Sequence, residues 1–420
     1  MLNKILLKNF SQISFVFALK MFNQLIIFSF IAHIFSIEEF GFIGFSITIS
    51  TIVANIIDYG YRLKVVKDIA GNKIKNIFSY FHRIFLLKII FSIFSLFLIL
   101  IYFLLRDFTN YEKIFFSLLI VSSSFISFSN LFASYFQAKK NFKIELFSNF
   151  ILSFSLFLYL ILIFFYKNFL LLSVFYLIGS VGMFIYSFNI FLKRNQFLLK
   201  KFFSYKKSDF FLLKKEILEV FPFSVHVIIS TFFANIDIVF VENFCNRQEL
   251  GIYQAFIKII FGMTIFSSIA STFLMPLISE KINNFKKSFH NKLVFFNRIL
   301  IGFFIFGSII FYIFSDIFIK ILFGKDFLEI NKILFYIIFI VFSKYFALIP
   351  SIIITSSGNQ IKRVKALLFV LLLNIILYFI FVPYGFIYAI KITTLGNFIT
   401  SVLYLFFSFK IIKSFLIFKK

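Results

Sequence analysis

Six charged residues lie inside stretches that are otherwise apolar, and their side chains are the best placed in this sequence to do chemistry. They are four lysines and two aspartates: Lys20, Lys258, Lys344, Lys391, Asp58 and Asp237. A lysine ammonium group binds phosphate, whereas a buried carboxylate pairs with a cation or carries a proton. Since lysines outnumber acids in these stretches, the pattern predicts a binding site for an anion.

The depth of the lysines indicates where their side chains point. A lysine at the centre of a bilayer costs roughly 2.5–3.5 kcal/mol unless it pairs, faces water or reaches the surface. Lys20 and Lys344 lie about ten residues from either end of their stretches, or about 15 Å at 1.5 Å per helical residue. We therefore expect both to face a water-filled cavity, and we expect the same of Lys258. Lys391 lies about six residues in, so a cavity position and extension to the outer surface both stay open.

The two aspartates allow two interpretations each. Asp58 precedes Arg62 by one helical turn, a spacing that favours a local ion pair at the membrane interface. Its alternative role is ion coupling. Asp237 lies deeper in its stretch and could balance the charge of a cavity lysine or carry a coupling proton.

Motifs for other chemistry are missing. The segment Phe323-Gly324-Lys325-Asp326 has Ile319 where a phosphate-binding loop needs its first glycine. The four histidines do not have metal-ligand spacing, and the single cysteine, Cys245, excludes an intramolecular disulfide and a cysteine metal cluster. No nucleophile-elbow pattern occurs. The sequence therefore predicts a protein that is not an enzyme and uses no cofactor or metal.

The amino-acid composition predicts that membrane-spanning helices position these charged residues. Of 420 residues, 61% are hydrophobic and only 14% are charged, against about 25% in soluble domains. A helix needs about 20 apolar residues to cross a bilayer. Twelve stretches qualify, with approximate limits 10–34, 41–61, 83–105, 113–136, 145–166, 168–192, 217–241, 250–278, 293–315, 332–355, 366–382 and 385–409. We therefore predict an all-α polytopic membrane protein of about 12 transmembrane helices.

The net charge of +26 is a topology signal. With the amino terminus inside, 32 of the 43 Lys and Arg residues fall in inner segments, 7 in outer segments and 4 within spans. Such a bias places both termini in the cytoplasm. No nucleic-acid partner is therefore needed to explain the basic charge.

The chain also divides at its midpoint. A basic stretch at 193–216 follows six spans and precedes six more, as in transporters built from two halves. We predict an amino-terminal six-helix bundle at 1–200, a basic cytoplasmic linker at 201–216 that lies on anionic phospholipids, and a carboxy-terminal six-helix bundle at 217–420. A weak repeat at an offset of 210 pairs Glu38-Glu39-Phe40-Gly41-Phe42 with Gln248-Glu249-Leu250-Gly251-Ile252.

Several short motifs resemble one known family. They are Glu38-Glu39-Phe40-Gly41-Phe42-Ile43-Gly44, Ile56-Ile57-Asp58-Tyr59-Gly60-Tyr61, Asn235-Ile236-Asp237, Glu249-Leu250-Gly251-Ile252-Tyr253, Leu322-Phe323-Gly324-Lys325-Asp326-Phe327 and Pro383-Tyr384-Gly385. Together they are similar to polysaccharide biosynthesis proteins, the O-antigen flippases (Wzx-type) of the multidrug/oligosaccharidyl-lipid/polysaccharide exporter superfamily. The resemblance covers nearly the whole chain, although each motif is short.

The resemblance implies a fold and an activity. The fold is two six-helix bundles in a MATE-like, V-shaped arrangement with alternating access. The implied activity moves undecaprenyl-pyrophosphate-linked oligosaccharide units from the inner to the outer leaflet of the bacterial cytoplasmic membrane, for O-antigen, capsule or another surface polysaccharide. A polysaccharide polymerase and a chain-length regulator are further partners that this pathway allows.

Residues and resemblance together give the leading hypothesis. The lysines Lys20, Lys258, Lys344 and Lys391 attract the pyrophosphate, while Asp237 and Asp58 balance charge or bind a coupling ion. One alternative is a multidrug cation extruder of the same superfamily, which the lysine excess disfavours. Another is a membrane-bound polymerase or glycosyltransferase, which the short outer loops disfavour. A scaffold that does not transport is a third.

Overall fold

Helices make up the architecture of this chain. The computed structural model describes residues 2–72, 74, 76–196, 210–282 and 287–417, and no β-strand occurs among them. Within these ranges, twelve helices are long and apolar enough to cross a membrane. The predictions of an all-α fold and of twelve spans are confirmed.

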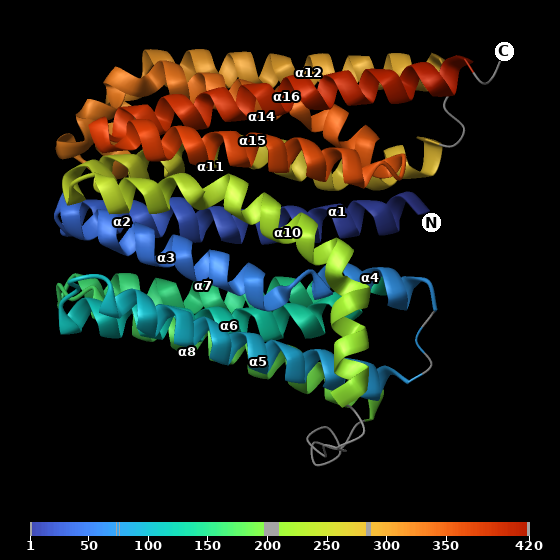
Figure 1. Cartoon of the computed structure of the whole chain (residues 1–420), viewed down its shortest axis with the longest axis horizontal. Coiled ribbons are helices and arrows are strands. Elements are labelled where there is room, and N and C mark those ends of the chain that lie inside the picture. Colours follow the sequence, from blue (N-terminus) through green and yellow to red (C-terminus); the bar gives the residue numbers. More distant parts are fainter. Residues whose placement is uncertain (1, 73, 75, 197–209, 283–286, 418–420) are drawn as a thin grey trace. The chain divides into compact units, whose positions relative to one another are not determined.

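Within the described residues, the first part of the chain contains five helices of 20 or more residues besides α1, together with the shorter η1, α2 and α4 (Figure 1). In order they are α1 (Leu2–Met21), the π-helix η1 (Phe22–Ile26), α2 (Ile27–Ile34), α3 (Ile37–Asp58), α4 (Tyr61–Ala70), α5 (Ile77–Leu104), α6 (Asn110–Ala138), α7 (Lys143–Ile163) and α8 (Leu170–Asn195). The rest are α10 (Phe210–Phe244), α11 (Arg247–Lys281), α12 (Lys287–Ile313), α13 (Ser315–Phe323), η4 (Lys325–Ile333), α14 (Leu334–Ser356), α15 (Gln360–Phe381), η5 (Val382–Tyr384) and α16 (Phe386–Ile417).

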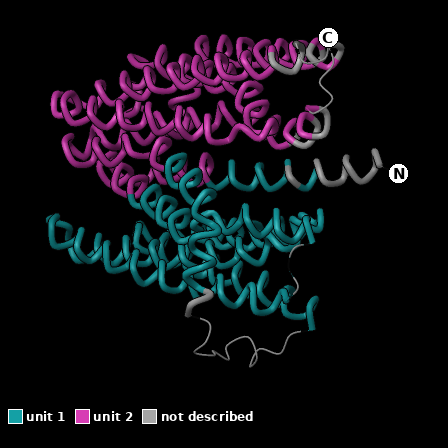
Figure 2. Tube along the Cα trace, turned by 45° about the vertical axis from the view of Figure 1, so that its right-hand side comes forward, with its two compact units in different colours: residues 1–23, 46–231 teal, residues 24–45, 232–420 magenta. Residues whose placement is uncertain are grey.

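Two compact units are present (Figure 2). Unit 1 comprises residues 1–23 and 46–231, and unit 2 comprises residues 24–45 and 232–420. These units differ from two consecutive halves because the segment 24–45 packs with unit 2. In that segment the Phe40 ring lies 5.1 Å from Phe327 and 6.0 Å from Phe323, centroid to centroid. The bundle limits predicted from the sequence stay a prediction.

Unit 1 is held together by aromatic rings and by small serine side chains. Phe81, Phe132 and Phe191, from α5, α6 and α8, are fully buried, and their ring centroids lie 4.5–6.1 Å from one another. Serines let the helices approach closely, and Ser129 and Ser155 donate across helices to backbone carbonyls at 3.1 and 2.6 Å. Small residues and such hydrogen bonds are what joins helices where lipid removes the hydrophobic driving force.

Two helix starts in unit 2 repeat one another. Ser36 and Glu39 exchange hydrogen bonds at the start of α3, and Asn246 and Glu249 form the same capping box at the start of α11. The two pairs are 210 residues apart, in agreement with the weak repeat in the sequence. The repeat also pairs Gly41 with Gly251, and a Cβ atom on Gly41 would lie only 2.7 Å from the Gly251 nitrogen.

Helix α10 contains Pro222 in its interior, and proline kinks helices because it lacks a backbone donor and crowds the preceding turn. Its first part runs across the long helices of unit 1 (Figure 1). Residues 210–216, which the sequence analysis places in the linker, therefore belong to a helix. Linker residues 201–209 lie outside the described residues.

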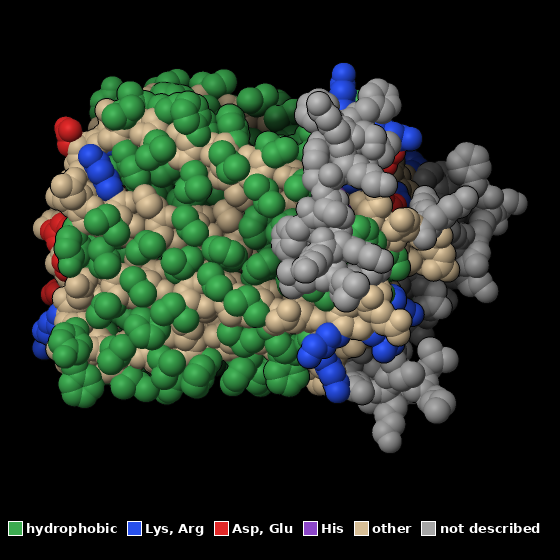
Figure 3. Space-filling model, turned by 90° about the horizontal axis from the view of Figure 1, so that it is seen from below, with side chains coloured by type: hydrophobic (Ala, Val, Ile, Leu, Met, Phe, Trp, Pro, Cys, Tyr) green, Lys and Arg blue, Asp and Glu red, His purple; other side chains and the backbone are tan. Residues whose placement is uncertain are grey.

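The outer surface is apolar. On α5, Ile93, Phe94 and Phe97 are each more than half exposed, and on the face shown in Figure 3 hydrophobic side chains cover the middle while charged side chains lie toward the ends. A soluble protein rarely exposes so large an apolar area. With its twelve spans, the chain is a multi-pass membrane protein. The cytoplasmic position of the termini stays a prediction.

Candidate functional site

A buried carboxylate organises the hydrogen bonds of unit 2. Asp237 of α10 is 3% exposed. Its Oδ2 accepts from the Tyr253 hydroxyl at 2.6 Å and from Thr393 Oγ1 at 3.2 Å. Its Oδ1 lies 2.9 Å from the backbone nitrogen of Ile238, and Tyr378 reaches the same Thr393 hydroxyl at 2.8 Å. Hydroxyl groups from α11 and α16 therefore hold this carboxylate, and no ion pair to it is formed within the described residues.

The two predicted lysines on α14 and α16 are exposed. Lys344 of α14 is attracted electrostatically to Asp237 but makes no ion pair within 4.0 Å among the described residues. Lys391 of α16 lies 5.1 Å above the ring of Tyr388. The structure therefore brings Lys344 under the influence of Asp237 and leaves Lys391 on an aromatic ring.

The role of the bridging hydroxyl can be tested by stability. Thr393→Val removes the donor to Asp237 and should lower the free energy of unfolding by about 1.5–3 kcal/mol, because a hydrogen bond to a buried charge is lost. Thr400→Val is the matched control, since the buried Thr400 donates only to the Gly396 carbonyl of its own helix. Thermal unfolding of both variants in detergent provides the comparison. Equal stability of the two variants would refute the bridging role.

Lys258 of α11 is enclosed. It is 4% exposed, its Nζ donates to Gln24 Oε1 at 2.8 Å, and the same atom lies 3.9 Å above the ring of Phe28. No carboxylate lies within ion-pair distance of it in the described part of the chain. Lys258 therefore packs between an amide oxygen and an aromatic ring, and its position on a water-filled cavity stays a prediction.

Unit 1 contains an ion pair that the sequence analysis missed. Lys88 of α5 is fully buried, and its Nζ lies 2.7 Å from Asp58 Oδ1. The same ammonium donates to the carbonyl and hydroxyl oxygens of Ser127 at 3.0 and 2.9 Å. The prediction of an ion pair between Asp58 and Arg62 is wrong. Only the backbone nitrogen of Arg62 reaches Asp58, at 3.3 Å.

The guanidinium of Arg62 instead turns toward α7. It lies 2.7 Å from Glu145 Oε1 and 3.4 Å from Gln137 Oε1. The pKa of Arg62 is raised, chiefly by the Glu145 carboxylate. Lys20 of α1 is half-buried, lies 5.6 Å from the Phe17 ring, is attracted by Glu145 and is repelled by Arg62. Lys20 therefore belongs to a polar group in unit 1.

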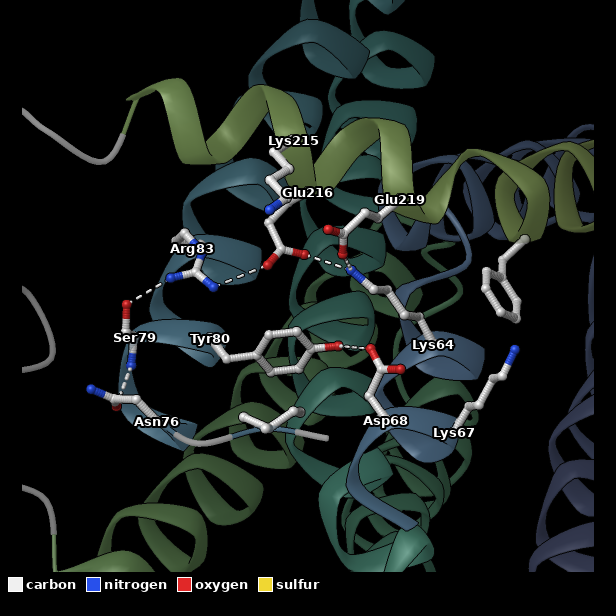
Figure 4. Close-up of a pocket in the computed structure, with 12 residues that line it drawn as sticks. Lys64, Lys67, Asp68, Asn76, Ser79, Tyr80, Arg83, Lys215, Glu216 and Glu219 are labelled. Carbon is white, nitrogen blue, oxygen red and sulfur yellow. Dashed lines mark hydrogen bonds and ion pairs between the residues drawn. The ribbon is translucent and has the colours of Figure 1, made fainter. Parts of the chain in front are cut away.

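A cavity of about 680 Å³ opens between α4, α5 and the start of α10 (Figure 4). In Figure 4, Lys64 and Arg83 point toward Glu216 from two sides. The Lys64 Nζ lies 2.7 Å from Glu216 and 2.9 Å from Glu219, and Arg83 Nη2 lies 3.0 Å from Glu216. Burial alone would lower the pKa of Lys64, but its hydrogen bonds to the two glutamates outweigh burial, so that pKa is raised. These ion pairs fasten the start of α10 to unit 1.

No metal centre is assembled in the described ranges, where no three His, Cys, Asp or Glu side chains gather in a way that could hold an ion. The ionisable groups instead form separate polar centres inside apolar helix bundles. Such an arrangement suits binding and movement of charge within a membrane.

A match to a protein-family model assigns this chain to a family. The family model described as "Polysaccharide biosynthesis protein" matches residues 6–282. The chain belongs to the polysaccharide biosynthesis protein family. No curated protein sequence matches the chain significantly.

Solved structures show the fold of this polysaccharide biosynthesis family member. An inward-facing multidrug resistance MATE family transporter of the MOP superfamily is similar with a TM-score of 0.71 at 12% identity, over 94% of this chain and 95% of that one. A MOP superfamily transporter from Pyrococcus furiosus gives 0.65 at 13% identity, over 98% and 96%. A Vibrio cholerae MATE transporter variant gives 0.64 at 14% identity, over 98% and 97%. The prediction of a MATE-like fold is confirmed.

The sequence analysis of this family member missed the ion pairs that join residues far apart in the sequence. The sequence analysis counts Lys88 with a cytoplasmic segment, although the span predicted at 83–105 already contains this residue. The helix begins six residues earlier, at Ile77, which places Lys88 three turns inside. A signal was present, since a lysine and Asp58 both inside spans predict a pair. The local sequence did not predict that Glu216 would form ion pairs with Lys64 and Arg83.

Proposed function

We propose that this polysaccharide biosynthesis protein moves an oligosaccharide attached to a polyprenyl pyrophosphate from the inner to the outer leaflet of the bacterial cytoplasmic membrane. The family and the MATE-like fold are those of a membrane transporter. The observation that carries the substrate class is Lys344, an exposed ammonium within a span. Its acidic neighbour, Asp237, is already held by two hydroxyl groups. Lys344 is therefore left to bind an anion.

Charge separates this proposal from its closest rival. A multidrug extruder of organic cations needs an acidic cavity, whereas the spans here carry lysines that have no ion pair among the described residues: Lys20, Lys258, Lys344 and Lys391. Pocket polarity varies on this fold, since the Pyrococcus furiosus transporter is described as having a binding pocket of reverse polarity. A phosphate-bearing lipid complements the exposed lysines, Lys344 and Lys391, and the apolar side chains of the spans.

Neutralising the lysines tests the binding role. Lys344→Ala should reduce translocation about tenfold with unchanged protein level, because a charge-assisted hydrogen bond contributes about 1.5–3 kcal/mol. Lys20→Ala should act in the same direction. Lys320→Ala, at an exposed lysine of α13 outside the spans, is the control and should leave surface glycan normal. Normal surface glycan in both test variants would remove the lysines from the binding site.

The pathway itself is tested in cells that lack the protein. A failed flippase leaves completed lipid-linked repeat units on the cytoplasmic side, whereas a failed polymerase leaves single units displayed at the surface. We expect internal accumulation that the wild-type chain reverses. Surface display of unpolymerised units would support the polymerase alternative instead. A polymerase, a chain-length regulator and anionic phospholipids beside the basic linker stay proposed partners.

A further inference from the structure

Among the residues whose burial the structure describes, three lysines are exposed to 5% or less: Lys64, Lys88 and Lys258. Two of them have carboxylate partners at 2.7 Å, Glu216 for Lys64 and Asp58 for Lys88. Lys258 has none among the described residues. It is therefore a buried ammonium whose charge no neighbouring acid neutralises.

The surroundings of Lys258 are built by close packing between α11 and the π-helix η1. Gly262, one turn after Lys258, has no side chain, and a Cβ there would lie 2.9 Å from Leu25 Cδ1. This close approach places Gln24 of η1 at 2.8 Å from the Lys258 Nζ. A π-helix is rare and is often found where function requires an unusual side-chain position.

The aromatic side of the site is equally fixed. Phe28 is 2% exposed, and its ring meets the fully buried ring of Phe40 edge to face at 5.8 Å. The Lys258 ammonium therefore has one amide acceptor and one ring face, where water would offer acceptors to all three of its hydrogens. Charge without a counter-ion is costly in such a place, and the neutral amine avoids that cost.

Neighbouring charged groups do not remove the imbalance. The elements packed against α11 are α12, η4, α14 and α16, and α2 follows η1 in the chain. The charged or titratable side chains of these elements include His33 (α2), Arg298 (α12), Lys325, Asp326, Glu329 and Lys332 (η4), Lys344 (α14), and Lys391, Lys410 and Lys413 (α16). None of them forms an ion pair with Lys258 within the ranges that the structure describes. His33 already meets the Ser29 carbonyl at 2.8 Å. The state of the amine therefore depends on its own exposure to water.

We propose that Lys258 is a proton-binding site that takes up and releases a proton as the transporter changes conformation. The enclosed geometry seen here, with Gln24 and Phe28, suits the neutral amine. Opening of the seam between η1 and α11 would admit water and restore the ammonium. This assignment separates Lys258 from the phosphate-binding role of Lys344. Its link to substrate movement rests on the proposed function.

Charge-locked variants distinguish a proton carrier from a phosphate ligand. Lys258→Arg keeps the charge permanently, and Lys258→Met removes it permanently. In proteoliposomes with an imposed pH gradient, we expect the wild-type rate to change severalfold when the gradient is collapsed. Both variants should lose that response. Lys320→Arg, at the exposed lysine of α13, should keep it. A normal gradient response in Lys258→Arg would overturn the proposal.

A second measurement needs no substrate. Purified protein labelled with ¹⁵N at the lysine side chains should show one resonance that is absent from Lys258→Met. We expect this resonance to change between ammonium and amine within the pH range over which transport depends on pH. A resonance that stays ammonium until the exposed lysines titrate would overturn the proton site. If the site titrates but no lipid-linked substrate moves, the proposed function fails and the proton site stands.

Discussion

Lys88→Met will destabilise unit 1 by roughly 3–5 kcal/mol, the cost of leaving one member of a buried ion pair without its partner. Lys88 is fully buried and bonds Asp58 and Ser127. Methionine fills a similar volume but cannot neutralise the Asp58 carboxylate, which is largely shielded from water. The effect is measured by thermal unfolding in detergent, with the fraction of protein that stays monodisperse as the readout.

A double variant separates charge from packing. Asp58→Asn with Lys88→Met removes both charges, so it should recover a large part of the lost stability. Lys320→Met, at the exposed lysine of α13, controls for the general effect of removing a lysine. If the double variant is as unstable as Lys88→Met alone, Lys88 does not stabilise unit 1 through its ion pair with Asp58.

Gly251→Ala will disrupt the contact between the starts of α3 and α11. A Cβ atom at Gly251 would lie 2.3 Å from the Ile37 carbonyl oxygen and 2.4 Å from Ile37 Cγ2. The carbonyl belongs to the backbone, so the helices must move apart. Overpacking of this kind typically costs about 1–3 kcal/mol, which exceeds the roughly 0.5–1 kcal/mol that alanine gains over glycine within a helix.

The chain provides matched controls for this glycine. Gly302 and Gly307 lie inside α12, and a Cβ atom on either would meet nothing within 4 Å. Gly302→Ala and Gly307→Ala should therefore be neutral or slightly stabilising in the same thermal assay. A loss of stability as large in these variants as in Gly251→Ala would show that glycine content, and not the close approach to Ile37, is responsible.

Hydropathy predicted the spans because bilayer thickness fixes the length of a crossing helix. All twelve predicted stretches correspond to helices of the structure. The division predicted between the spans 366–382 and 385–409 is also present, since Gly385 ends the short helix η5 with φ of +128° before α16 begins. The boundaries of the helices were predicted less accurately than their presence. Helix α5 starts at Ile77 and α10 at Phe210, because each helix continues on the amino-terminal side of the charged residues near which the predicted span begins, Arg83 in α5 and Lys214 to Glu216 in α10.

Side-chain partners could not be predicted in the same way. The pairs Lys88–Asp58, Arg62–Glu145 and Lys64–Glu216 join residues that are 30, 83 and 152 positions apart. Their formation depends on which helices pack together and at what rotation, and periodicity does not contain that information. The sequence marked Asp237 and Lys258 as unusual, but only the structure shows that hydroxyl groups hold Asp237 and that Lys258 faces Gln24 and Phe28.

The most direct test is a translocation assay on the purified chain. Vesicles containing the protein and a polyprenyl-pyrophosphate-linked oligosaccharide are treated with an impermeant glycosidase, and the digested fraction is measured over time. We expect digestion to proceed beyond the outer-leaflet share in vesicles with the wild-type chain and to stop at that share in protein-free vesicles. With Lys344→Ala, digestion beyond that share should be about tenfold slower. Digestion that stops at the outer-leaflet share with the wild-type chain, under every imposed ion gradient, would contradict the proposed function.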